Sequence, residues 1–442
     1  MSQVPDKMAS GPAPAPRALS TVDVFCWRVL IWGLGLSTPL LTSLKPRRFI
    51  AGELDVAEGV GDLSYLASKG FYLLFLILAT VALFRHLSSG DKSGARGRGF
   101  WGLTILLAAL PTVSTLVSGG TLTLSLLGTL AIYSATYFMP TPSLEWLVRQ
   151  LRVMLMCVFV YGSLAVAVLF PDWAWNPSYA EESALALFPM RLYGMAAHAN
   201  SLAPLAIFVW MLGRFPGCRL RGEPVHVAAI VLVLLLSQSK TNLVLAVLLC
   251  CAYLLIRLNS LGRFKRYLGF SVIASSSALF LVYLFKFSSY ASRIEDMMYD
   301  PQIITLSGRV PLWLLAVDMW LERPWFGQGL DAWSSKASLD YFDFLGWAAT
   351  HAHNQILQVL SQTGLVGLAA LLLWSRSFYR IVRAVPDTVR IPLYWTCAFY
   401  FLPGFTEVIF QYTLGQGATL LTWMLSVMVL YSLRIYSRPV TG

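Results

Sequence analysis

Charged residues are scarce in this chain. Only 12% of its 442 residues are charged, against about 25% in an average soluble domain. Acids are scarcer than bases, 22 against 33, and hydrophobic residues make up 57% of the chain. This composition excludes an ordinary soluble globular protein, and we expect an all-α integral membrane protein.

Cysteines are also few and give no sign of a disulfide framework. All six of them fall in predicted membrane segments or inner loops, so none is expected to form an external disulfide. The formal net charge of +11 follows the membrane topology described next. It therefore does not predict a nucleic-acid partner; the expected surroundings are a lipid bilayer.

Long apolar segments recur through the chain. Because a bilayer is crossed by about 20 apolar residues in a helix, the sequence predicts about twelve transmembrane helices. We place them at 26–44, 66–87, 100–117, 120–139, 147–170, 194–213, 224–237, 240–257, 267–287, 353–374, 391–411 and 416–434. The first nine thus fill residues 26–287, and the last three lie within 353–442, which ends in a short cytoplasmic tail.

The positive charges orient these segments. With the N-terminus inside, most of the 33 Lys and Arg residues fall in inner loops, as the positive-inside rule requires. The basic clusters at 214–221 and 257–266 both lie inside only if two helices separate them, so "SQSK" (237–240) turns at the outer surface. Both termini are then cytoplasmic, and residues 1–25, rich in Pro, Ala and Ser, form an expected disordered tail.

The largest outer segment is 288–352. A connection of this length is unusual unless it is functional, and we expect it to be partly helical, with an amphipathic helix at 307–323. Ser307 is a plausible N-cap, and Arg309 falls in the first turn, where free N–H groups favour an anion. Arg309 is equally placed to pair with a neighbouring acid. The apolar residues at helical spacing are Val310, Trp313, Leu314, Val317 and Leu321.

Two of the five histidines stand together in "THAHNQ", at the start of the tenth segment. His351 and His353 have three interpretations: polar residues at a helix start beside Asn354, zinc ligands, or a general base. A zinc site needs a third ligand, such as Asp340, Asp343 or His198, and no known ligand spacing supports it. A neutral imidazole just outside the bilayer suits a base that takes a proton from a sugar hydroxyl.

A second polar group occurs near the sixth segment. "MRLYGMAAHANSLAPLA" (190–206) brings Arg191 to the mouth of the segment, with His198 and Asn200 further along, and Lys240 is expected at the same outer level. Ionisable residues at such positions are costly and usually functional. For Arg191 and Lys240 the alternative is that the long side chain only reaches the membrane–water interface, where its charge is solvated. Together with Arg309, they suit a polyanionic substrate such as a prenyl diphosphate.

The stretches "SGRVPLWLLAVDMWLERPWFGQGLDAW" and "HAHNQILQVLSQTGLVGL" resemble the shared domain of the O-antigen ligase and O-antigen polymerase superfamily. The resemblance is specific over about 300–375, weaker over 190–245, and limited to hydropathy before that. It implies a GT-C-like fold in the bacterial inner membrane, with the large loop and the active site facing the periplasm.

The resemblance also implies a chemistry. Such enzymes transfer a glycan from undecaprenyl diphosphate to an acceptor sugar without a metal or another cofactor. His353 would be the catalytic base, with Arg191 and Arg309 binding the diphosphate. The expected substrate-binding residues are Lys240, His351, Asn354, His198 and Asn200. Lys240 departs from the family pattern, in which we expect arginine, and lysine lacks the bidentate fork of arginine.

The acceptor is left open. One dominant outer loop favours an O-antigen ligase, which transfers to lipid A–core, over a polymerase of O-antigen or exopolysaccharide, which transfers to a second lipid-linked glycan. A lipid-glycan flippase or transporter is a third alternative, but it predicts charges spread through the membrane segments. A metal-dependent transferase is the fourth, and its support is the acidic first loop, with Glu53, Asp55, Glu58 and Asp62.

Overall fold

The protein is described by a computed structural model. The structure describes residues 19–43, 60–89, 97–120, 124–176, 188–196, 198–259, 309–333, 351–405, 407–410 and 417–436. Several predictions fall wholly or mostly outside these residues: the tail at 1–25, the ninth membrane segment at 267–287, the outer segment at 288–352 with Ser307, Asp340 and Asp343, and Glu53, Asp55 and Glu58 of the acidic loop.

The described residues are almost entirely helical, in agreement with the expected all-α fold class. The longer helices are α1 (Thr21–Ser43), α2 (Val60–Ser89), α3 (Arg98–Val117), α4 (Leu124–Phe138), α5 (Leu144–Leu155), α6 (Gly162–Leu169), α9 (Ala199–Leu212), α10 (Glu223–Ser237), α11 (Lys240–Asn259), α15 (Arg309–Glu322), α18 (Gln355–Ala384), α19 (Asp387–Phe401) and α20 (Gly417–Tyr436). The shorter elements are the π-helix η2 (Met156–Tyr161), α7 (Pro171–Ala174), the 3-10 helices η3 (Leu330–Trp333) and η4 (Leu402–Phe405), and an antiparallel pair of two-residue strands, β1 (Trp175–Asn176) and β2 (Arg191–Leu192).

Six stretches of helix are long and apolar enough to cross a membrane. They are Thr21–Leu41, Leu66–Ser88, Arg98–Val117, Leu144–Leu169, Gln355–Ala384 and Gly417–Tyr436. Among the described residues a helix overlaps each other predicted segment as well, but α9, α10 and the apolar part of α11 are shorter. The chain is thus an all-α membrane protein, and the number of twelve crossings stays a prediction.

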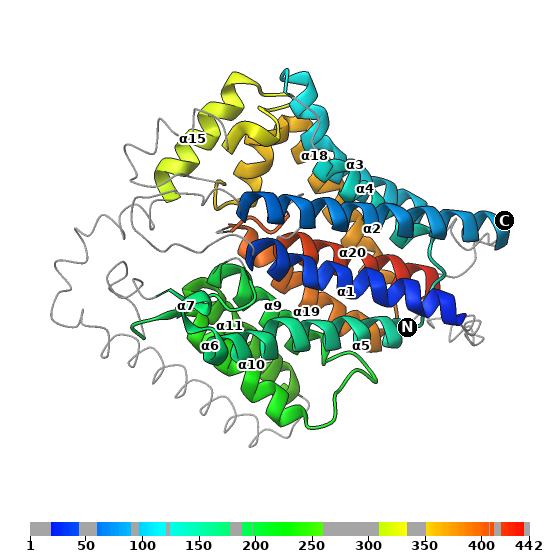
Figure 1. Ribbon diagram of the computed structural model, residues 1–442, viewed down its shortest axis with the longest axis vertical. Coiled ribbons are helices and arrows are strands. Elements are labelled where there is room, and N and C mark those ends of the chain that lie inside the picture. The colour runs from blue at the N-terminus through cyan, green and yellow to red at the C-terminus, as the bar shows by residue number, and fades with distance from the viewer. Residues whose placement is uncertain are drawn as a thin grey trace, which may run out of the picture.

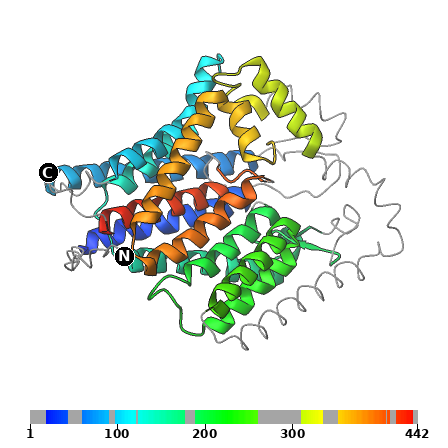
Figure 2. The same ribbon diagram turned by 180° about the vertical axis from the view of Figure 1, so that it is seen from behind.

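Helix α20 forms the centre of the bundle. It is buried over most of its length and contacts α1, α3, α5, α9, α18 and α19. Figures 1 and 2 show α1, α2, α5 and α20 running side by side. Buried tryptophans tie neighbouring helices through hydroxyl groups: Trp423 Nε1 donates to Thr136 Oγ1 at 2.9 Å, and Trp374 Nε1 donates to Thr104 Oγ1 at 3.0 Å. Hydroxyl groups suit this role because an apolar interior supplies few other hydrogen-bond acceptors.

The two ends of the bundle differ in their polar contacts. At one end Arg152, fully buried, donates to the carbonyls of Val209 and Cys218 and pairs with Glu223 at 2.7 Å. At the opposite end α9, α11, α15, α18 and α20 begin, and α10 and α19 finish. Helix ends carry backbone groups without partners in the helix, so this second end is rich in polar groups that can bind a ligand.

A break in α18 joins it to the segment after α15. Gly364 has φ 62° and ψ −157°, which interrupts the helix, and Figure 2 shows α18 changing direction beside α15. The break exposes backbone groups, and the segment 324–329 pairs with them. Leu365 N donates to Pro324 O at 2.8 Å, and Gln328 N donates to Ser361 O at 2.8 Å. The glycines in "PWFGQG" and "SQTG" therefore allow these two backbone segments to approach and hydrogen-bond, an arrangement that we call the backbone interlock.

Helix α15 occupies Arg309–Glu322, within the predicted 307–323. The face of the helix that is buried differs from the row of apolar residues that the sequence pattern indicated. The buried residues are Leu312, Leu315, Ala316 and Met319, whereas Leu314 and Leu321 of the predicted stripe are exposed. The helix is apolar on both faces, one against α18 and one outward, which explains why the pattern did not identify the packed face.

We predict that Gly364→Ala lowers the thermal stability of the protein in detergent. At φ 62° and ψ −157° the backbone is in a region essentially restricted to glycine, which costs another residue roughly 1–3 kcal/mol, and the added Cβ would lie 2.4 Å from the carbonyl of Trp325. The melting temperature should fall by several degrees. Gly70→Ala is the matched control, since a Cβ at Gly70 of α2 meets nothing within 4 Å. Equal melting temperatures for the two variants would contradict the interlock.

Candidate functional site

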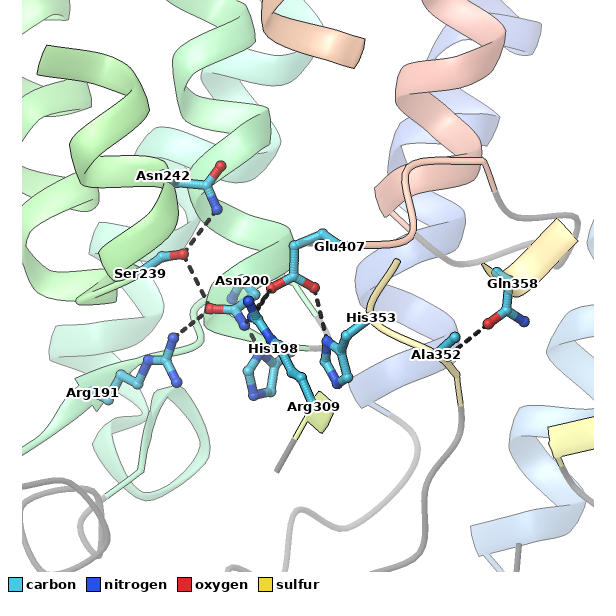
Figure 3. A network of polar contacts seen from close by, with 10 residues as sticks. All are labelled: Arg191, His198, Asn200, Ser239, Asn242, Arg309, Ala352, His353, Gln358 and Glu407. Carbon is cyan, nitrogen blue, oxygen red and sulfur yellow. Dashed lines mark hydrogen bonds and ion pairs between the residues drawn. The ribbon is translucent and has the colours of Figure 1, made fainter. Parts of the chain in front are cut away.

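Glu407 lies at the centre of a polar network at the end of the bundle where α18 and α20 begin (Figure 3). Its Oε1 accepts a hydrogen bond from Arg309 Nη2 at 2.8 Å and one from Asn200 Nδ2 at 3.3 Å. Its Oε2 lies 3.1 Å from His353 Nδ1. The carboxylate thus joins three segments that are far apart in the sequence.

His353 is held in position by the segment that precedes α18. Its backbone is left-handed, with φ 48°, a costly conformation that tends to occur at functional sites. The segment is fixed on both sides: Asn354 caps α18 by accepting from the N–H groups of Ile356 and Leu357, and Ala352 N donates to the Gln358 side chain at 2.7 Å. The imidazole is therefore presented by a rigid turn.

The rings of His351 and His353 lie side by side, with centroids 4.1 Å apart. The two residues lie in the bend before α18, where the left-handed backbone of His353 departs from the extended segment that would place i and i+2 on one side. Burial, followed by the charge of His353, lowers the pKa of His351 from its ordinary value to about 4. His351 is therefore neutral at pH 7.

Arg191 is anchored on strand β2, with its guanidinium among helix ends. Its Nε donates to Ser237 O at 2.8 Å, and its Nη2 donates to Asn200 Oδ1 at 2.6 Å. Ser239 Oγ also donates to Asn200 Oδ1, at 3.1 Å. Lys240 is the next residue, the first of α11, and its side chain is exposed.

His198 completes the group as the N-cap of α9. Its Nδ1 accepts the backbone N–H of Asn200 at 3.1 Å, and its ring contacts that of Tyr193 at a tilt of 52°, with centroids 4.8 Å apart. The structure thus gathers residues singled out from the sequence around one point, namely Arg191, His198, Asn200, Arg309 and His353 (Figure 3). His351 lies against His353, Asn354 follows it in the chain, and Lys240 is close enough to Arg191 for their charges to interact.

The carboxylate at the centre is ionised. Burial by itself would raise the pKa of Glu407, but the hydrogen bond from His353 and the charges of His353 and Arg309 outweigh it. The net effect holds that pKa below its ordinary value. Glu407 therefore keeps its negative charge at neutral pH, between a guanidinium and an imidazole.

A metal ion could also be ligated here, by His351, His353 and Glu407. One ligand atom from each lies within 4.8 Å of the others, and two imidazoles with a carboxylate are a set that zinc accepts. Arg309, however, lies 2.8 Å from the same carboxylate. A divalent cation would meet the charge of this guanidinium, so the charge distribution favours an anion over a metal.

The sequence analysis missed Glu407. It is the only acid in residues 388–442, in the apolar stretch "FLPGFTEVIF". An isolated acid in such a stretch is itself a signal of function, and it was the one signal that could have found the residue. Glu407 is the acid that pairs with Arg309, the alternative that the sequence had left open for this arginine.

We predict that the protein loses thermal stability in detergent as the pH falls from about 6.5 toward 4. In this window unfolded His351 takes up a proton that folded His351 rejects, because burial has lowered its pKa. Protonation of Glu407, whose pKa is also lowered, continues the loss at still lower pH. His351→Gln should reduce the fall in melting temperature between pH 6.5 and 4. His86→Gln, in α2, serves as the control, and an unchanged fall in His351→Gln would contradict the prediction.

A model of a known protein family matches part of the chain. Residues 225–372, from α10 to the first part of α18, match the family model described as O-antigen ligase. No curated protein matches the chain. Arg309, His351 and His353 fall inside the matched residues, whereas Arg191 and Glu407 fall outside. The match agrees with the resemblance that the motifs gave: residues 225–372 are similar to the O-antigen ligase family.

Proposed function

We propose that the protein transfers a glycan from undecaprenyl diphosphate to an acceptor sugar, without a metal, at the periplasmic face of the inner membrane. The observation that carries this proposal is the contact of His353 with Glu407 beside two arginines. A base and a diphosphate-binding site are the two elements that such a transfer requires.

His353 is the general base of the proposed reaction. Because the carboxylate of Glu407 accepts from Nδ1–H, the neutral ring presents Nε2 as its proton acceptor. Glu407 then acts as the orienting group, in the role of the third member of a catalytic triad. It fixes the tautomer and stabilises the imidazolium that forms.

Arg309 and Arg191 bind the leaving diphosphate. A guanidinium carries five N–H donors, so Arg309 can hold Glu407 and still donate to a phosphate oxygen. Arg191 approaches from the other side of Asn200. Lys240, at the start of α11, adds a third positive charge near Arg191. Fixed charges at the developing negative charge lower the barrier without a metal ion.

The chemical step is a direct displacement. The acceptor hydroxyl oxygen forms a bond to the anomeric carbon, and the bond from this carbon to the phosphate oxygen breaks. The hydroxyl proton moves to Nε2 of His353, and undecaprenyl diphosphate leaves with the bonding electrons. The anomeric carbon is inverted, because the acceptor attacks opposite the leaving group.

The acceptor that we favour is lipid A–core, as in an O-antigen ligase. The single dominant outer segment at 288–352 is the feature that favours it. Leu314 and Leu321 on the outward face of α15, and Trp325 after it, are exposed and suit a lipid-anchored acceptor of either kind. A polymerase acting on a second lipid-linked glycan uses the same chemistry, and the acceptor in the first experiment separates the two.

The experiment supplies purified protein with an undecaprenyl-diphosphate glycan and lipid A–core in the presence of EDTA. We expect transfer onto lipid A–core that survives EDTA and falls by about 10²–10⁴-fold in His353→Ala, the contribution typical of a general base. His86→Ala is the control histidine. Glycan polymers on undecaprenyl diphosphate would identify a polymerase instead. Loss of activity in EDTA would refute the metal-free mechanism, and glycan crossing a sealed vesicle without transfer would identify a flippase.

A second prediction concerns Glu407. Glu407→Gln keeps the size of the side chain but removes the charge that pairs with Arg309 and orients His353. We expect the turnover number to fall by at least about tenfold, with a smaller change in KM for the glycan donor, since the carboxylate acts on the base. Glu322→Gln, an exposed acid on α15, should behave as wild type. A Glu407→Gln variant with unchanged turnover would remove Glu407 from the mechanism.

A further inference from the structure

His198 is a third imidazole of the site, and its contacts fix its tautomer. Its Nδ1 accepts the backbone N–H of Asn200, as the N-cap of α9. A ring nitrogen that accepts a hydrogen bond carries a lone pair, so the proton of the neutral ring lies on Nε2. Protonation of Nδ1 would place two N–H groups against each other and break the cap.

The position of His198 brings this N–H to the site. Figure 3 shows its ring between Arg191 and His353, and the charges of Arg191, His353 and Glu407 all act on it. Because Nδ1 faces the end of α9, Nε2 on the other side of the ring is directed away from that helix end. The ring of Tyr193 packs against the imidazole at a tilt of 52°.

We propose that His198 binds the diphosphate of the lipid-linked donor through Nε2–H, as a donor that stays neutral throughout the reaction. This inference rests on the proposed function. Since Nδ1 is committed to the cap, His198 does not compete with His353 for the proton of the acceptor hydroxyl. The two histidines therefore divide the work: His353 accepts a proton, and His198 donates a hydrogen bond.

The chain offers a substitution that separates this role from capping. Asparagine is among the preferred N-cap residues, and its side-chain oxygen accepts the same backbone N–H. His198→Asn thus retains the cap of α9 but lacks the Nε2–H donor, whereas His198→Ala lacks both. His86→Asn is the matched control, since His86 lies near the end of α2.

The experiment measures the affinity of the purified full-length protein in detergent for undecaprenyl diphosphate without glycan, together with the melting temperature. We expect His198→Asn to bind about 10–100-fold more weakly, the loss expected for one hydrogen bond to a charged group, with a melting temperature close to wild type. His198→Ala should bind as weakly and melt lower. His86→Asn should bind as wild type.

Two results would overturn the inference in different ways. If His198→Asn binds the lipid diphosphate as tightly as wild type does, His198 is not its ligand, and the proposed transferase is unaffected. If wild type itself fails to bind undecaprenyl diphosphate, both the inference and the proposed function are wrong. Nitrogen NMR of the ring gives a further check, because an Nδ1–H tautomer of His198 would contradict the assigned hydrogen bond.

Discussion

The polar end of this protein depends on one carboxylate shared between a guanidinium and an imidazole. Glu407 meets Arg309 at 2.8 Å and His353 at 3.1 Å, and these residues lie 98 and 54 positions away in the chain. The pair is only partly buried, but removing one partner would still leave the other charge in a poorly solvated place without it. The same contact that holds α15 and the start of α18 against the bundle also orients the proposed base, so stability and function rest on one group.

The backbone around this contact is fixed by conformations that few residues adopt. Gly364 interrupts α18 with a positive φ, and the freed backbone groups pair with the segment that follows α15. His353 has a positive φ without being a glycine. The turn that carries His353 is thus attached to the beginning of α18. Helix α15, which begins at Arg309, is attached to the break in α18 through the segment that follows it. Arg309 and His353 consequently keep a defined distance despite coming from separate segments.

Much of this arrangement could be predicted from the sequence, and the reason for the rest is physical. Apolar length and the distribution of arginines predicted the helical membrane protein, and "HAHN" placed two imidazoles together at the start of a helix. Local pattern failed where a choice depended on tertiary packing. It did not identify the packed face of α15, whose two faces are both apolar, and it did not find Glu407, whose partners are distant in the chain. It grouped Arg191 with Arg309 by topology, but it could not supply Asn200 as the group between them.

Asn200 links the part of the site around Arg191 to the part around Glu407 and His353. Its Oδ1 accepts from Arg191 and Ser239, and its Nδ2 donates to Glu407. An amide has an acceptor and a donor in one rigid plane, so the guanidinium of Arg191 and the carboxylate that orients His353 are held at opposite sides of a single group. An aspartate would repel the carboxylate, and an apolar residue would leave both charges without this link. The separation between Arg191, the proposed diphosphate-binding charge, and the carboxylate that orients the proposed base is therefore set by covalent geometry in one side chain, which the first turn of α9 holds in place.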